Sequence, residues 1–94
     1  MAVGVLTLRI HLPGCSSLKE KRGRLKPLLA RLHLEFNLSV AEIELQDTWQ
    51  SATIQCALVN SSAAHAQSSM QRVVTWIEAN WSDVEVIDDQ LEII

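Results

Sequence analysis

Aromatic residues and cysteines are scarce in this sequence. It contains no tyrosine, one phenylalanine, three tryptophans and two cysteines among its 94 residues. Because Cys15 and Cys56 are too few for a disulfide framework, we interpret them as reduced thiols. No run approaches the roughly 20 apolar residues of a membrane span, and the first twelve residues lack the basic stretch of a signal peptide. We therefore expect a soluble, cytoplasmic protein without membrane contact.

Positive charge is concentrated in one short stretch of an acidic chain. The formal net charge is −3, from eight basic and eleven acidic residues. Six of the eight basic residues lie between positions 19 and 31, namely Lys19, Lys21, Arg22, Arg24, Lys26 and Arg31. This distribution does not fit a generally basic nucleic-acid-binding protein. It indicates one basic helix on an acidic body.

Hydrophobic periodicity predicts six elements in the order β-α-β-β-α-β. Period-two alternation predicts strands over residues 3–12, 40–46, 52–59 and 83–94. Helical spacing predicts a helix that begins after Ser17, in a capping box with Glu20, and stops at Asn37. A second helix follows the N-cap candidates at residues 60–62. Pro27 lies inside the first helix and removes a backbone donor, so we expect a kink there or a break into two segments.

The alternation also assigns each strand side chain to one face of the sheet. In the first strand the core-facing residues are expected to be Leu6, Leu8, Ile10 and Leu12. In residues 40–46 one face is expected to carry Ala41, Ile43 and Leu45, and the other Val40, Glu42, Glu44 and Gln46. The register of the last strand blurs at residues 87–89, which predicts a bulge or bend.

Two helices and four strands, each with one apolar face, predict a single α+β domain over residues 1–94. The expected architecture is a two-layer, ferredoxin-like βαββαβ sandwich, with two helices on one face of a four-stranded antiparallel sheet. The usual strand order for this plan, 4-1-3-2, places the second and fourth strands at the edges. Both carry acidic residues, which discourage aggregation through sheet edges.

Several families with this fold plan need residues that the sequence lacks. RNA-recognition motifs stack bases on aromatic residues of the two central strands, and residues 3–12 and 52–59 contain none. KH domains need a GxxG loop, which the three glycines do not form. Acylphosphatases place an arginine in the loop after the first strand, and residues 13–16 contain none. A phosphate-binding glycine loop is also absent.

The basic first helix is the strongest candidate for a binding site. Its candidate residues for nucleic acid or another anion are Lys19, Lys21, Arg22, Arg24, Lys26 and Arg31. The helix dipole disfavours cations in the first turns, so helix stability does not explain the cations at positions 19–22. One interpretation is a surface that meets phosphates. The other is a solvated helix face whose cations balance an acidic body.

The open face of the sheet is a second candidate. The side chains expected to point away from the helices are Arg9, His11, Glu42, Glu44, Thr53 and Gln55. One interpretation is a surface for a polar ligand or a partner. The other is the solvated side of an antiparallel sheet, or an interface between copies of the chain.

Catalytic and metal sites are weaker candidates. No familiar metal-ligand spacing is formed by His11, Cys15, His33, Cys56 and His65, so neither a metal nor a cofactor is expected. Cys15 lies near a helix N-terminus, but the sequence places no base beside it, and Cys56 alternates with core residues. An enzyme is the least favoured class because no nucleophile–base pair is evident. The tryptophans Trp49, Trp76 and Trp81 are expected to be core or hairpin residues.

Five phrases of the sequence resemble one bacterial family. They are Val3-Gly4-Val5-Leu6, His11-Leu12-Pro13-Gly14, Ser17-Leu18-Lys19-Glu20-Lys21-Arg22, Phe36-Asn37-Leu38-Ser39-Val40-Ala41-Glu42 and Gln46-Asp47-Thr48-Trp49-Gln50. Together they resemble the YlxP-like proteins, a family named as domain of unknown function five hundred and three. The resemblance covers nearly the whole chain and implies a ferredoxin-like fold and a bacterial cytoplasmic setting. It implies a ribosome- or RNA-associated role by genetic association alone, and no catalytic or binding residues.

Two functional hypotheses follow from the sequence. The first is a small cytoplasmic binding module that contacts RNA or a ribonucleoprotein through the basic first helix. The second is a homo-oligomeric interaction or regulatory domain that uses the open sheet face, with or without a small-molecule ligand. Salt-dependent RNA binding separates the first hypothesis from the second.

Overall fold

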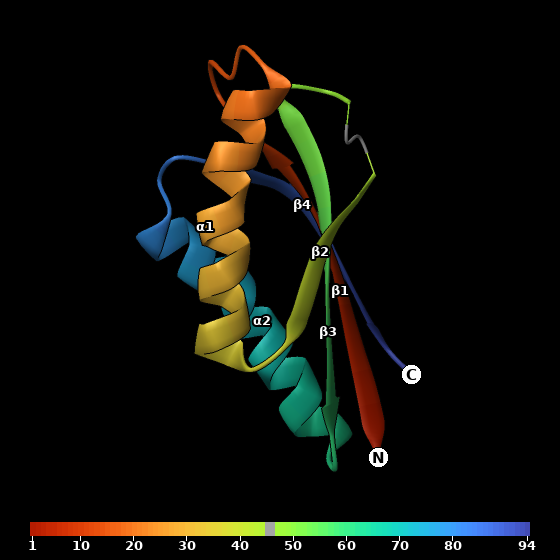
Figure 1. The fold of residues 1–94 in the computed structure, drawn as a ribbon. Helices are drawn as coiled ribbons and strands as arrows, with labels where there is room; N and C mark the ends of the chain where they lie inside the picture. The colour runs from red at the N-terminus through yellow and green to blue at the C-terminus, as the bar shows by residue number, and fades with distance from the viewer. Residues whose placement is uncertain (45–46) are drawn as a thin grey trace.

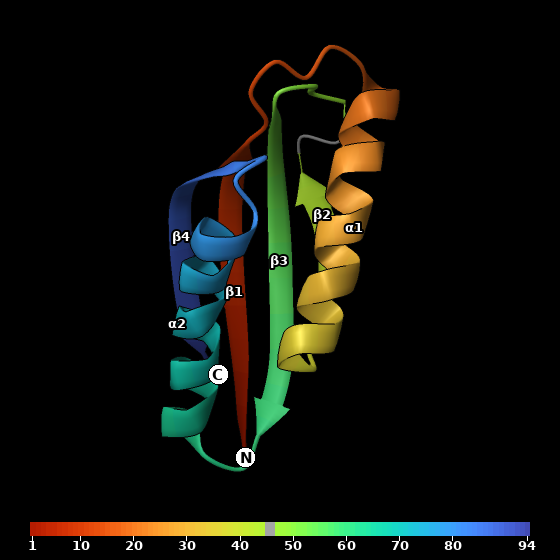
Figure 2. The ribbon, with the colours of Figure 1, turned by 90° about the vertical axis from the view of Figure 1, so that its left-hand side faces the viewer.

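The structure is a computed structural model that describes residues 1–44 and 47–94. The elements follow the predicted order: β1 (Ala2–His11), α1 (Leu18–Phe36), β2 (Ser39–Glu44), β3 (Ser51–Asn60), α2 (Ala63–Asn80) and β4 (Glu85–Ile93). Both helices cover the same face of one sheet, which leaves the other face open (Figures 1 and 2). The predicted two-layer α+β architecture is confirmed.

The sheet has the order β2-β3-β1-β4, and every neighbouring pair is antiparallel. β2 and β4 are therefore the edges, as predicted. The predicted inward residues of β1, Leu6 to Leu12 in alternation, are all buried in one core cluster. Cross-strand neighbours such as Ile54, opposite Leu8, complete the sheet side of this core.

Local signals fix both ends of α1. Ser17 is the N-cap, and its Oγ accepts a hydrogen bond from the backbone N–H of Glu20 at 3.0 Å. The Glu20 carboxylate does not complete the predicted capping box; instead it accepts from Ser16 Oγ at 3.3 Å and lies 3.5 Å from Arg24 Nη1. Asn37 ends the helix in the left-handed conformation, with φ of 49°, which asparagine tolerates better than most residues.

Pro27 does not divide α1 into two segments. The helix runs as one element from Leu18 to Phe36 (Figure 1). A proline at this position cannot donate to the carbonyl of Gly23. Because Gly23 and Pro27 both lie on the exposed side of the helix, water can hydrogen-bond that carbonyl, and the cost of the missing bond is small enough for the helix to continue.

The predicted faces of β2 are wrong from Val40 to Glu42, where the two faces are exchanged. Val40 and Glu42 lie opposite the buried residues Cys56 and Ile54, so both point toward the helices. The register then shifts between Glu42 and Glu44. One extra residue in a strand reverses the alternation, and Glu44 consequently lies on the open face. Leu45 and Gln46, whose faces the sequence also predicted, lie outside the described residues.

The predicted irregularity in β4 is confirmed. Arg9 of β1 pairs with Asp88, but Ile10 pairs with Val86, which leaves Ile87 as the extra residue. β4 begins at Glu85, two residues later than predicted. Within the described residues, no helix is long and apolar enough to cross a membrane.

Candidate anion-binding helix and open sheet face

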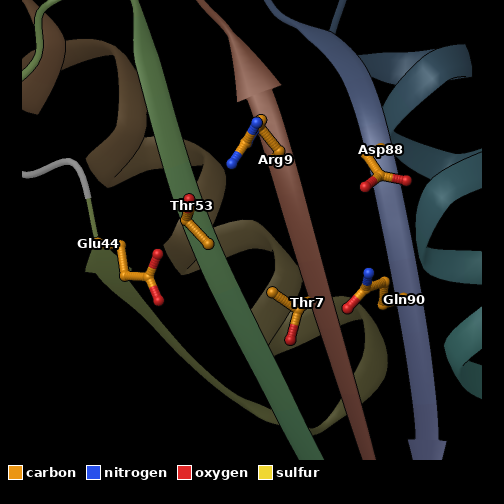
Figure 3. A pocket seen from close by; sticks show the side chains of 6 residues that line it. All are labelled: Thr7, Arg9, Glu44, Thr53, Asp88 and Gln90. Atoms are coloured by element: carbon orange, nitrogen blue, oxygen red, sulfur yellow. The ribbon is translucent and has the colours of Figure 1, made fainter.

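A row of four side chains crosses the open face, one from each strand. Glu44 lies opposite Thr53, Thr53 opposite Arg9, and Arg9 opposite Asp88. With Thr7 and Gln90, these residues line a polar hollow of about 260 Å³ (Figure 3). The row thus places one guanidinium near the middle of the sheet, between two carboxylates at its edges.

Thr53 is the unusual member of this row. It is only 6% exposed, and its Oγ1 has no hydrogen-bond partner among residues 1–44 and 47–94. A buried hydroxyl without a partner is destabilising by about 1–3 kcal/mol. Other polar side chains of this face pair with the protein: Gln55 Nε2 donates to Thr7 Oγ1 at 3.2 Å, and His11 Nδ1 donates to the Gln50 carbonyl at 2.9 Å. The open face therefore presents polar groups to solvent or to a partner, without the predicted Glu42.

Lys21 is not a surface cation, which corrects its place among the candidate binding residues. Its side chain is 1% exposed, and Nζ lies 2.7 Å from Glu42 Oε2 of β2. Nζ also donates to the carbonyl of Thr48 at 2.6 Å. A buried ammonium needs such partners because burial removes its hydration. Lys21 therefore joins α1 to β2 and to the segment after it.

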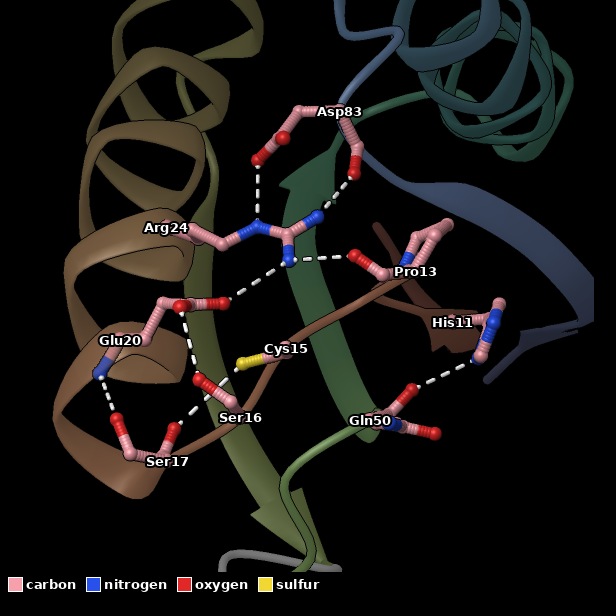
Figure 4. Close-up of polar contacts among 9 residues, drawn as sticks. All are labelled: His11, Pro13, Cys15, Ser16, Ser17, Glu20, Arg24, Gln50 and Asp83. Atoms are coloured by element: carbon pink, nitrogen blue, oxygen red, sulfur yellow. Dashed lines mark hydrogen bonds and ion pairs between the residues drawn. The ribbon is translucent and has the colours of Figure 1, made fainter.

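Arg24 is also used inside the protein. Its Nε donates to Asp83 Oδ2 at 2.8 Å, Nη2 to the Asp83 carbonyl at 2.6 Å, and Nη1 to the Pro13 carbonyl at 2.9 Å (Figure 4). The hydrogen bond that Arg24 donates to the Asp83 carboxylate raises the pKa of Arg24 above its ordinary value. Arg24 thus links α1 to the loop after β1 and to the loop before β4, with most of its donors occupied.

Arg31 packs along the outer surface of the helices. Its Nη2 lies 3.0 Å from Glu35 Oε1, one turn along α1, and its guanidinium carbon lies 5.6 Å from the ring centre of Trp76 on α2. Both contacts are attractive for a guanidinium. Three of the six candidate cations of the first helix are therefore engaged with the protein itself.

The remaining three cations form what we call the cation stripe: Lys19, Arg22 and Lys26. All three are exposed, and none makes an ion pair within residues 1–44 and 47–94. Their spacing of three and four residues places them on one side of α1. Arg22 and Lys26 also border a groove of about 200 Å³, which is lined further by Leu25, Leu29 and Glu42.

Trp49 is the residue that the predicted sites left out. Trp76 and Trp81 pack against the core, as expected, and their rings stack at 6.1 Å. Trp49, in contrast, is 51% exposed and lies outside the core cluster. The available signal in the sequence was a tryptophan next to Asp47 and Thr48, in a polar connection between two strands.

The two cysteines lie in the interior of the protein. Both are free and buried, and burial raises the pKa of Cys56 to about 12. Cys15 Sγ donates to the Ser17 carbonyl at 3.5 Å from its buried position behind the helix start (Figure 4). In the described part of the chain, no three His, Cys, Asp or Glu side chains gather in a way that could hold a metal ion.

Comparison with known proteins settles the family. A family model described as "Protein of unknown function (DUF503)" matches residues 3–91. The chain belongs to this family. The resemblance to YlxP-like proteins is thereby confirmed, and the cation stripe, Trp49 and the open-face row all lie inside the matched region of this DUF503 member.

Two similar proteins illustrate the match. The uncharacterized protein YlxP of Bacillus subtilis (strain 168) is 44% identical over 63 residues, which are 67% of this chain and 68% of that protein. Among solved structures, a de novo designed protein with a ferredoxin fold, LFR1 1, superposes with a TM-score of 0.56 at 10% identity. The superposition covers 100% of this chain and 84% of the designed protein. At this low identity the likeness confirms the fold of this DUF503 member and nothing further.

Proposed function

We propose that this DUF503 protein is a small binding module that contacts RNA, alone or in a ribonucleoprotein, through the cation stripe. One observation carries the proposal. Of the six cations crowded into α1, the protein uses Lys21, Arg24 and Arg31 for its own contacts, and the other three face solvent together on one side. A row of exposed cations on an otherwise acidic protein complements a polyanion.

Helix stability gives no reason for the first cation of the stripe. Lys19 lies in the first turn of α1, where the positive end of the helix dipole repels a cation. A phosphate near this end would meet both the dipole and the side chains of Lys19 and Arg22, and both interactions are attractive. Contacts to phosphates carry no base information, so binding through the stripe should be weakly sequence-selective.

Salt-dependent binding to single-stranded RNA tests this function. If the stripe neutralises three phosphates on a single strand, the logarithm of affinity should fall against the logarithm of salt concentration with a slope of about −2. Fluorescence anisotropy of a labelled oligonucleotide measures both affinity and slope. Replacing all three stripe residues by glutamine should flatten the slope and should weaken binding to RNA of every sequence to the same extent.

A matched pair of single substitutions separates the stripe from net charge. Arg22→Gln and Arg72→Gln each remove one exposed arginine, but Arg72 lies on α2. Only Arg22→Gln should reduce affinity and lower the slope by about 0.7. Equal effects of the two changes, or no binding by the native protein at about 20 mM salt, would remove this function.

The hydroxyl of Thr53, which has no partner in the described part of the chain, favours a second candidate, a homo-oligomer joined through the open face. A second copy over the row would supply Thr53 with a partner and would bring Arg9 near acidic side chains. Light scattering across a concentration series tests this candidate. A monomer at all concentrations, unchanged by Arg9→Glu, excludes it.

A further inference from the structure

Trp49 is a large aromatic side chain outside the core that the described residues form. It is half-exposed and lies outside the core cluster, unlike Trp76 and Trp81, which contact each other and the core. Exposing so much apolar surface is unfavourable in water. An exposed tryptophan on a connecting loop is therefore a candidate for ligand contact rather than for stability.

The backbone on either side of Trp49 is held in place. The carbonyl of Thr48 accepts from the buried Lys21 Nζ at 2.6 Å. The carbonyl of Gln50 accepts from Leu12 N at 2.9 Å and from His11 Nδ1 at 2.9 Å (Figure 4). These bonds anchor the residues before and after the tryptophan to α1 and β1. The backbone that carries the Trp49 ring, which we call the platform, is thus held in place, and this reduces the backbone entropy lost when a ligand binds to the ring.

The same bonds place the platform beside the cation stripe. The segment that carries Thr48 to Gln50 runs next to the N-terminal turns of α1 in both views (Figures 1 and 2). Lys21, which holds this segment, is flanked in the sequence by Glu20 and by Arg22 of the stripe. The backbone that carries Trp49 and the first two cations of the stripe, Lys19 and Arg22, therefore lie at the same end of the molecule, on neighbouring elements.

The surroundings of Trp49 suit a nucleobase better than a phosphate. The ring borders a shallow hollow of about 420 Å³, whose other lining residues are Asp47, Thr48 and Gln50. The carboxylate of Asp47 would repel a phosphate. Carboxylate and amide groups, however, hydrogen-bond the edges of bases, and an aromatic face stacks on any of them.

We propose that Trp49 stacks on a base of single-stranded RNA while the cation stripe holds neighbouring phosphates. This inference rests on the proposed function and narrows its ligand class, because a base inside a duplex is not available to a single exposed ring. Loss of the ring should weaken binding to a single strand by about 5- to 150-fold, the usual range for one base–aromatic stack. Duplex RNA should be bound through phosphates alone.

Two substitutions at Trp49 and two RNA forms make the test. The affinities of a labelled single strand of about eight nucleotides and of a duplex of the same length are measured by anisotropy for the native protein, Trp49→Phe and Trp49→Ala. We expect Trp49→Phe to retain most of the single-strand affinity and Trp49→Ala to lose it, while duplex binding and the salt slope stay unchanged in both. Thermal unfolding of each variant checks that the fold is intact.

The outcomes distinguish a failure of the stacking inference from a failure of the proposed RNA-binding function. Native binding that depends on Arg22, with the same single-strand affinity in Trp49→Ala, overturns the stacking inference and leaves the RNA-binding function standing. Equal losses of single-strand and duplex affinity in Trp49→Ala overturn it as well, because a stack on one unpaired base cannot affect a duplex. Absence of any RNA binding at about 20 mM salt overturns both.

Discussion

The buried ion pair between Lys21 and Glu42 predicts a large loss of stability when only one partner is replaced. In Lys21→Met the Glu42 carboxylate loses a cation 2.7 Å away, and the Thr48 carbonyl loses a donor at 2.6 Å. Breaking a buried pair costs about 3–5 kcal/mol. We expect the lower end, about 3 kcal/mol, because the Glu42 side chain is 18% exposed and water still reaches it.

Urea unfolding at neutral pH, followed by circular dichroism, measures this loss. For a domain of this size a change of 3 kcal/mol shifts the midpoint by about 1–3 M. Lys19→Met is the matched control, since the same change at an exposed position two residues earlier should alter stability by less than about 0.5 kcal/mol. The double variant Lys21→Met/Glu42→Leu should recover most of the loss, because no unpaired charge remains buried. Equal midpoints for Lys21→Met and Lys19→Met would refute the structural role assigned to Lys21.

Two further predictions concern the core. Leu32→Ala should lower the free energy of unfolding by about 2–5 kcal/mol, because Leu32 is fully buried. Leu34→Ala, at a position 76% exposed, should change it by less than about 0.5 kcal/mol. Similar urea midpoints for the two variants would show that the buried face of α1 is assigned wrongly. Burial raises the pKa of Cys56 from 9.0 to about 12, so between these pH values the unfolded chain releases a proton that the native state retains. The free energy of unfolding should therefore be unaffected below about pH 9 and should fall by up to about 1.4 kcal/mol per pH unit above it. If the Cys56→Ala protein loses stability with the same slope above about pH 9, the effect does not come from Cys56.

Elements and their ends were predictable because their signals are local. Ser17 and Asn37 bound α1 as expected, since capping depends on the residue itself and on backbone groups within one turn. The irregularity at Ile87 was visible as an interrupted alternation. That the helix continues through Pro27 was not predictable from the sequence. The effect of a proline depends on whether water can reach the carbonyl that loses its donor, and this exposure is a property of the packed molecule.

The candidate site was predictable only as a stretch of charge. The sequence located six cations on one helix, and it indicated an acidic second strand. It did not show that Glu42 faces the helices, because the shift before Glu44 reverses the alternation and leaves no clear mark in so short a strand. Nor did it pair Lys21 with Glu42 or Arg24 with Asp83, which lies 59 residues further along the chain.

The sequence by itself determined the order of elements, the buried face of β1 and the ends of the first helix, because periodicity and capping act over a few residues. Tertiary structure decided which cations the protein keeps for itself and which it presents to solvent. A charged side chain is buried only where a partner from a distant segment compensates for its lost hydration. Such partners meet only when the sheet brings β2, the segment after it and the start of β4 to the side of α1.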